Sequence, residues 1–282
     1  MKLLVCGDVV GRAGRNVVCD QVPLLRKALG LDFVVVNGEN AAGGFGITGE
    51  ICGQFYAAGV DAITTGNHVW DQRETASYIL RDPKLLRPHN FPPATPGRGV
   101  GVFPTASGKR VVILHVMMQL FMEPLDNPFT CLEQQLATHK LGRNADLILV
   151  DAHGEATSEK VAIGHFCDGR VSAVIGTHSH IPTADAQILP GGTAYQTDLG
   201  MCGDYDSVIG MKKDVAVARF VNKLRGERLS PAEGEATLCA AYIETDDATG
   251  LATHISPLRL GGRLQPHWPL PAPMGSLKPP KF

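Results

Sequence analysis

Five polar segments, each directly after a short apolar run, contain the residues with the most informative chemistry. They are Gly7-Asp8, Asn37-Gly38-Glu39-Asn40, Gly66-Asn67-His68, Asp151-Ala152-His153-Gly154 and Gly176-Thr177-His178-Ser179-His180. The last segment carries two imidazoles one residue apart, which can reach two different metal ions from one rigid base. Carboxylate and amide oxygens are hard ligands and imidazoles are borderline ones, so the set suits a pair of first-row metal ions. Such a pair could activate a water and neutralise a bound phosphate.

The apolar runs before these segments are typical of buried strands. They cover residues 2–6, 33–36, 62–65, 147–150 and 171–175. Longer amphipathic stretches separate most of them, and this alternation indicates β-α units with a largely parallel sheet. Because the loops at the carboxyl ends of parallel strands converge on one crevice, we expect the five polar segments to meet there.

Helical spacing of apolar residues predicts a helix over 15–29, in which Pro23 should cause a kink or a break into two pieces. Two further helices are expected over about 48–58 and 71–80. Turn signals predict three hairpins, which join 100–103 to 110–115, 186–189 to 193–197, and 238–244 to 251–255. The expected chain is therefore a mixture of β-α units and antiparallel hairpins.

Length and charge limit the class of protein. The 282 residues are 44% hydrophobic and 19% charged, which is ordinary for a globular α/β protein. We expect residues 1–260 to form the domain and residues 261–282, with six prolines, to form an extended C-terminal tail. The net charge of −2 argues against a surface that coats a polyanion, so stable nucleic-acid binding is not expected.

The cysteines and the apolar runs indicate the compartment. Seven cysteines, an odd number without a Cys-x-x-Cys pair, favour free thiols in a reducing cytoplasm. The apolar run before Gly7 is too short for the core of a signal peptide. No segment approaches the ~18 apolar residues of a membrane span. We therefore expect a cytoplasmic protein that makes no use of a membrane.

Glu39 and His68 have distinct expected roles. Two ions ~3.5–4 Å apart need a bridging anion, and Glu39 is the carboxylate we expect between them. His68 directly follows the expected ligand Asn67. Its ring should therefore lie near the metals without necessarily touching them. That position suits a general acid that protonates a departing alkoxide, or a donor that stabilises the charge of the transition state.

The segments together resemble the calcineurin-like metallophosphoesterases, and more narrowly their YmdB-type bacterial subgroup. Sequence motifs typical of that subgroup are present in residues 7–11, 37–42, 66–71 and 153–160, and the resemblance covers roughly residues 1–260. It implies an α/β fold in which two mixed β-sheets form a sandwich flanked by helices, in four layers ordered αββα. It also implies a phosphodiesterase of small phosphodiesters, with 2',3'-cyclic nucleotides as the leading substrate class.

The resemblance further implies a dinuclear centre, with iron as the expected metal and manganese as the second choice. One ion would be held by Asp8, Glu39, Asn40 and His180. The other would be held by Glu39, Asn67, His153 and His178. By the same resemblance His68 is the proton donor, the partner is a small-molecule phosphodiester, and the chain could form a homo-oligomer.

Two segments depart from the family pattern. The superfamily usually begins with Asp-x-His, whereas Asp8-Val9-Val10 lacks the histidine, and Asn40 is expected to fill that coordination position. The subgroup often has an Asn-Leu-Gln-Gly-Arg type of segment where this chain has His115-Val116-Met117-Met118-Gln119. This second departure bears on the substrate and leaves the metal ligands unchanged.

Several of these residues could instead have a purely structural role. Asp8 and Asn67 could be turn or N-cap residues, which Asp and Asn favour. His115 could belong to the core or to the pocket. Five histidines are interpreted as structural: His89, His139, His165, His254 and His267.

Other polar or glycine-rich segments also have two interpretations. Arg12 and Arg15 could bind substrate phosphate or be exposed. The glycines of residues 43–46 could form a phosphate-binding loop, but a tight loop that passes beside the site is the favoured interpretation. Glu155 and Glu159, four residues apart with Lys160 nearby, indicate the start of a helix with a solvated face.

Two rival functions follow from the same residues. The first is a phosphomonoesterase or a nuclease that uses the same pair of metals in a different pocket. The second is a non-catalytic regulator that binds a nucleotide or a partner protein in that pocket.

Overall fold

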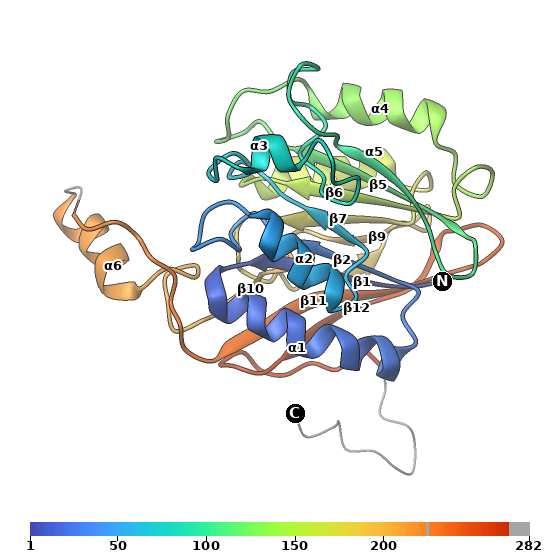
Figure 1. The fold of residues 1–282 in the computed structure, drawn as a ribbon. Helices are drawn as coiled ribbons and strands as arrows, with labels where there is room; N and C mark the ends of the chain where they lie inside the picture. The colour runs from blue at the N-terminus through green and yellow to red at the C-terminus, as the bar shows by residue number, and fades with distance from the viewer. Residues whose placement is uncertain (224–225, 271–282) are drawn as a thin grey trace, which may run out of the picture.

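Two six-stranded β-sheets pack against each other in the computed structural model, which describes residues 1–223 and 226–270 (Figure 1). The first sheet has the order β12-β11-β10-β1-β2-β3. Its strands are β1 (Lys2–Val9), β2 (Phe33–Asn37), β3 (Ala62–Thr64), β10 (Met201–Asp204), β11 (Ala236–Thr245) and β12 (Ala252–Leu260). The second sheet has the order β4-β5-β6-β7-β9-β8. Its strands are β4 (Val100–Pro104), β5 (Arg110–Met117), β6 (Leu147–His153), β7 (Ala173–Thr177), β8 (Gln187–Ile188) and β9 (Ala194–Gln196).

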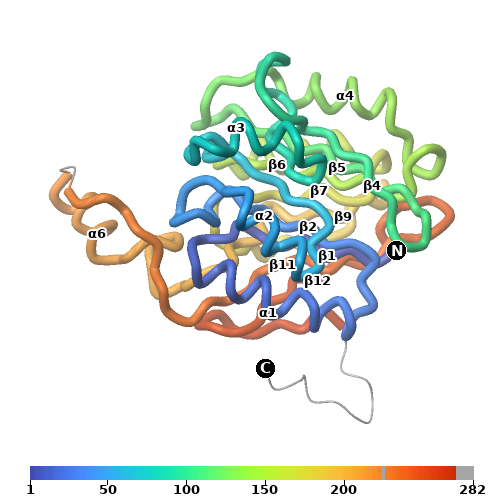
Figure 2. Tube along the Cα trace, in the orientation of Figure 1, coloured from blue at the N-terminus to red at the C-terminus, as the bar shows by residue number. Residues whose placement is uncertain are grey.

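Helices lie outside the two sheets (Figure 1). They are α1 (Gly11–Leu29), α2 (Gly49–Ala57), α3 (Thr75–Tyr78), α4 (Pro128–Thr138), α5 (Thr157–Cys167) and α6 (Lys213–Asn222). In Figure 2, α1 and α2 lie over the first sheet, α4 lies beyond the second, and α6 projects from the body. The predicted αββα arrangement is confirmed. Among the described residues, none of the helices combines the length and apolarity needed to cross a bilayer.

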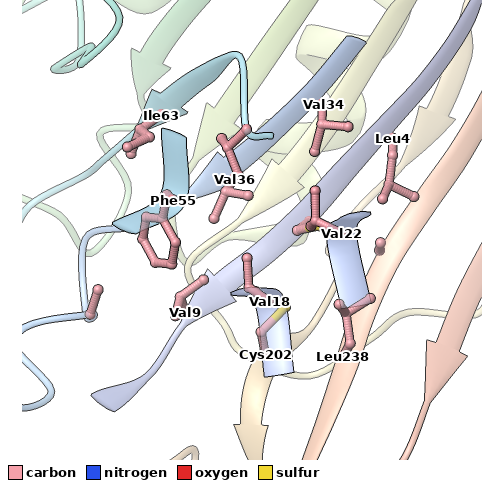
Figure 3. Packing of buried hydrophobic residues seen from close by; sticks show 14 of the residues in the cluster. Leu4, Val9, Val18, Val22, Val34, Val36, Phe55, Ile63, Cys202 and Leu238 are labelled. Atoms are coloured by element: carbon pink, nitrogen blue, oxygen red, sulfur yellow. The ribbon is translucent and has the colours of Figure 1, made fainter. Parts of the chain in front are cut away.

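The alternation of side chains along β1 explains the layers. Leu3 and Val5 point into the cluster between the sheets, whereas Leu4 packs in the cluster beneath the helices. Figure 3 shows this second cluster, in which Val18 and Val22 of α1 pack against the first sheet. All of these side chains are at most 2% exposed, so both faces of the strand are buried. A strand with two buried faces reads as a continuous apolar run, as β1 does in the sequence.

The predicted strands and hairpins are present, but they are divided between two sheets. The pairs β1–β2, β2–β3 and β6–β7 are parallel, as expected for β-α units. The three predicted hairpins form the antiparallel pairs β4–β5, β8–β9 and β11–β12. The loops that follow the parallel strands of the two sheets meet on one side of the sandwich.

Two helix predictions were wrong in part. Helix α1 begins at Gly11 and continues through Pro23, so it does not split. Pro23 lies on its exposed side, while Val22 and Leu25 remain buried against the sheet and hold the helix together. The helix expected over 71–80 is only α3, and turns with backbone bonds from Thr75 to Gln72 and from Ser77 to Glu74 precede and enter it. The side chains of Gln72 and Glu74 tie this stretch to Phe45 and Gly49.

The first part of the predicted tail lies against the domain. Arg259 and His267 exchange two backbone hydrogen bonds, and Trp268 and Leu270 pack against the cluster beneath α1. The rest of the predicted tail, residues 271–282, lies outside the described residues.

Candidate metal centre

The seven expected ligands come together where the carboxyl ends of β1, β2, β3, β6 and β7 meet. Hydrogen bonds join segments that are far apart in the chain. The N–H of His178 donates to Asp8 Oδ2 at 3.1 Å. Asn40 Oδ1 lies 3.3 Å from His180 Nε2. Asn67 Oδ1 lies 3.1 Å from His153 Nε2.

Two groups of side chains are arranged so that each could hold a metal ion. The first comprises Glu39, His153 and His178, and the second comprises Asp8, Glu39 and His180. Within each group the donor atoms lie within 4.8 Å of one another. Glu39 belongs to both groups, so its carboxylate lies between the two candidate positions.

The two carboxylates of the centre are buried, and one oxygen of Asp8 lacks the partner that usually accompanies burial. Asp8 is 0% exposed, and among the described residues its Oδ1 atom has no hydrogen-bond partner. Burial raises the pKa of Asp8 above its usual value, although His180 and His153 oppose this. A buried, unpartnered carboxylate oxygen beside imidazoles fits a bound cation, because a cation would supply the missing partner.

The charges of Glu39 and His153 depend on each other. Burial alone would raise the pKa of Glu39, but the charge and hydrogen bond of His153 outweigh it and lower that pKa. The same contact raises the pKa of His153 against the effect of burial. Burial and the nearby charge of His153 lower the pKa of His178 to about 3. The neutral form of His178 is the form that can bind a metal.

The backbone around the centre is crowded and strained. A Cβ added to Gly66 would lie 2.2 Å from Glu39 Oε2 and 2.2 Å from His153 Nε2, so only glycine fits beside these donors. His178 and His180 have φ angles of 100° and 66°, in the left-handed region that residues other than glycine rarely adopt. Strained residues of this kind occur mainly at functional sites.

Hydrogen bonds orient two of the candidate histidine ligands. Thr177 Oγ1 donates to Asp151 Oδ1 at 2.7 Å, so its oxygen can accept the N–H of His153 Nδ1 at 2.9 Å. His180 Nδ1 lies 2.8 Å from the carbonyl of Ile209, to which it can donate. In both rings Nε2 is then the nitrogen with a free lone pair for the centre. Sequence reasoning missed Thr177 and Asp151 because their role depends on contacts between neighbouring strands.

His68 lies beside the centre and is partly exposed. Its side chain is 29% exposed, and its N–H donates to Glu39 Oε2 at 3.2 Å. Its Nδ1 atom lies 2.8 Å from Asp71 Oδ2, so Nε2 is the ring nitrogen left for substrate. Phe45 packs edge-on against the ring at 5.1 Å between centroids. Asp71 is a further residue that sequence reasoning gave no role.

A cavity of about 280 Å³ opens onto the centre. Residues from the loops after strands of both sheets line it, together with residues from the segments before and after α6. They include Glu39, Asn40, His68, His178, His180 and Leu229. Glu155 also lines it, with its Oε2 atom 3.3 Å from His178 Nε2. A small molecule can therefore reach four of the candidate ligands from one side, namely Glu39, Asn40, His178 and His180.

Several residues with two interpretations lie away from this cavity. His115 is fully buried in β5, where its Nδ1 atom lies 3.3 Å from the carbonyl of Asp151, which favours the core interpretation. Arg12 pairs with Glu233 at the surface. Arg15 donates to the carbonyl of Ala41, so it supports a loop of the site.

Lys160 lies in the core rather than on the solvated face of its helix. Its side chain is 1% exposed, and its ammonium donates to Asp198 Oδ2 at 2.8 Å. The sequence pattern around it suggested a surface helix, because a buried lysine needs a distant carboxylate that the local pattern does not show. Glu159 instead accepts the N–H groups of Gln119 and Leu120.

The fold is that of the calcineurin-like phosphoesterases. The solved calcineurin-like phosphoesterase YfkN from Bacillus subtilis has a TM-score of 0.51 at 12% identity, over 92% of this chain and 90% of that one. Within this fold, the YmdB-like protein family matches residues 4–258, and the chain belongs to that family. The predicted resemblance is therefore confirmed.

Two relatives are similar over nearly their whole length. A 2',3'-cyclic-nucleotide 2'-phosphodiesterase of Bacillus subtilis is 44% identical over 255 residues, which cover 90% of this chain and 95% of the relative. A solved hypothetical protein from Thermus thermophilus is 40% identical with a TM-score of 0.86, over 93% of this chain and 100% of that one.

Proposed function

We propose that this chain is a metal-dependent phosphodiesterase that hydrolyses small phosphodiesters, with 2',3'-cyclic nucleotides as the leading substrates. The observation that carries the proposal is the position of Glu39, which belongs to two groups of buried donors at once. A shared carboxylate is what a pair of closely spaced cations requires. The relative named for this activity, at 44% identity, supports the choice of substrate.

In this proposal Asp8, Glu39, Asn40 and His180 hold one ion, and Glu39, Asn67, His153 and His178 hold the other. The oxygen and imidazole donors suit iron, with manganese as the alternative, and the unpartnered oxygen of Asp8 fits a bound cation. When bound, the ions would activate a water and neutralise the phosphate. The protein would act in the cytoplasm.

The protein's own contribution to the reaction is proton transfer and orientation. His68 would give the proton on Nε2 to the ribose oxygen that leaves phosphorus. Asp71 accepts from Nδ1, which keeps the ring in one orientation and leaves Nε2 for the substrate. Exclusion of water by Phe45 on one face of His68 would strengthen this interaction.

The size of the cavity favours a small substrate. Its volume of about 280 Å³ lies near the lower end, roughly 300 Å³, of the range for small-molecule sites. A nuclease would need a basic surface that tracks a phosphate backbone, and the net charge of −2 gives no sign of one.

The test is turnover by purified protein after metal removal and reloading with Mn²⁺. We expect hydrolysis of 2',3'-cyclic nucleotides, and faster cleavage of bis-p-nitrophenyl phosphate than of p-nitrophenyl phosphate. The opposite preference would identify a phosphomonoesterase. Tight binding of cyclic nucleotide without turnover at saturating Mn²⁺ would identify a regulator and overturn the proposal.

A further inference from the structure

The segment that carries the two candidate histidine ligands needs outside support. Left-handed backbone at both His178 and His180 persists only where surrounding contacts over-determine it. The residue between them, Ser179, donates its N–H to Asp198 Oδ2 at 2.9 Å. Asp198 is therefore the carboxylate that holds this segment at its centre.

A buried lysine holds Asp198 in place. Lys160 Nζ donates to Asp198 Oδ2 at 2.8 Å and to the carbonyl of Thr177, the residue before His178, at 2.7 Å. The side chains of Lys160 and Asp198 are each 1% exposed. Gly176 makes room for them, because a Cβ added there would lie 2.9 Å from Lys160 Cδ and 1.7 Å from the carbonyl oxygen of Thr197.

The same carboxylate reaches a third candidate ligand on the other sheet. Asp198 Oδ1 accepts the N–H of Gly200 at 2.8 Å. The carbonyl of Gly200 in turn accepts the N–H of Asp8 at 3.2 Å. One ion pair is thus connected to Asp8 in the first sheet and to the His178–His180 segment after the second.

We propose that Lys160 and Asp198 are positioning residues that hold Asp8, His178 and His180 in the geometry that binds metal. This inference rests on the proposed dinuclear centre. A buried ion pair contributes little net stability compared with a well-packed apolar pair, so stability alone does not account for it. Neither side chain is among the described residues that line the cavity. Their contacts with the ligand segments are hydrogen bonds to backbone groups.

The test compares Mn²⁺ affinity in three variants by calorimetric titration of the metal-free protein. Asp198→Asn replaces one acceptor oxygen by an amide that cannot accept from a backbone N–H. The double variant Lys160→Met/Asp198→Asn leaves no unpaired charge in the core, so it should fold where the single variant does not. Asp168→Asn is the control, because Asp168 also accepts two backbone N–H groups, from Gly191 and Thr193, in a turn away from the centre.

We expect the Kd for Mn²⁺ to rise about 10–100-fold in the double variant and to stay within about twofold of the wild type in the control. Excess Mn²⁺ should restore most of the turnover, which a merely unfolded variant would not show. Unchanged Mn²⁺ affinity in a folded double variant would overturn the inference while leaving the phosphodiesterase proposal intact. If the wild type bound no Mn²⁺, the dinuclear centre itself would be refuted, and this inference with it.

Discussion

His68 is linked to Asp71 through its ring and to Glu39 through its backbone. Its Nδ1 atom lies 2.8 Å from Asp71 Oδ2, and its N–H donates to Glu39 Oε2 at 3.2 Å. A single residue thus connects the shared carboxylate of the candidate centre with an aspartate outside it. This arrangement separates proton transfer from metal binding, and the two can be tested by different substitutions.

Substitution His68→Ala should lower kcat by about 10²–10⁴-fold, the usual contribution of a general acid, while both metal ions stay bound. Asp71→Asn should cause a smaller loss, because the ring remains but is less well oriented. Steady-state kinetics together with elemental analysis of the same samples gives the answer. Loss of metal from the His68→Ala protein would instead assign this histidine to the ligands.

Substitution Glu39→Gln should reduce the bound metal from two ions per chain to one or none. The amide keeps one acceptor oxygen but loses the negative charge that two neighbouring cations need between them. Elemental analysis after gel filtration measures the stoichiometry. Asp82→Asn, at a carboxylate bonded to Tyr56 away from the cavity, is the control. Two retained ions in the Glu39→Gln protein would contradict the bridging role.

Substitution Thr177→Val should weaken metal binding about 10–100-fold, because the hydroxyl that orients His153 is lost. The shape of the side chain is nearly unchanged. Thr193→Val provides the comparison, since Thr193 is equally buried and bonds to the carbonyl of Val171 at a distance from the centre. Equal effects of the two substitutions on Mn²⁺ affinity would show that Thr177 has no special role.

Metal removal should destabilise the folded chain. Asp8 and Glu39 are buried together, and cations between them would relieve their repulsion. An ion at 100 times its Kd stabilises the folded state by about 2.7 kcal/mol, which corresponds to a rise in Tm of roughly 5–10 °C in a protein of this size. Differential scanning fluorimetry with and without Mn²⁺ measures it, and a Tm that does not respond to Mn²⁺ would argue against a buried metal site.

The sequence predicted the parts of the site that are local. Polar residues directly after apolar runs marked the ends of β1, β2, β3, β6 and β7, and the structure places those ends together. Apolar periodicity also located the face of α1 that carries Val18 and Val22. These features depend on residues only a few positions apart, so a linear pattern contains them.

What the sequence missed depends on distant partners. Lys160 and Asp198 are 38 positions apart, and only the packing of α5 beside β7 and β9 brings them together. The left-handed backbone of His178 and His180 could not be predicted either, since histidine adopts it only in a small minority of cases. The contacts of Gln72 with Phe45 and of Glu74 with Gly49 likewise join segments more than twenty positions apart.

A crystal structure of the protein grown with Mn²⁺ tests the central claim most directly. We expect two ions about 3.5–4 Å apart, with the Glu39 carboxylate in contact with both, as in other two-metal sites. His178 should bind one of the ions and Asp8 the other. Absence of anomalous density at the centre, or density for a single ion that does not contact Glu39, would contradict a dinuclear centre bridged by Glu39.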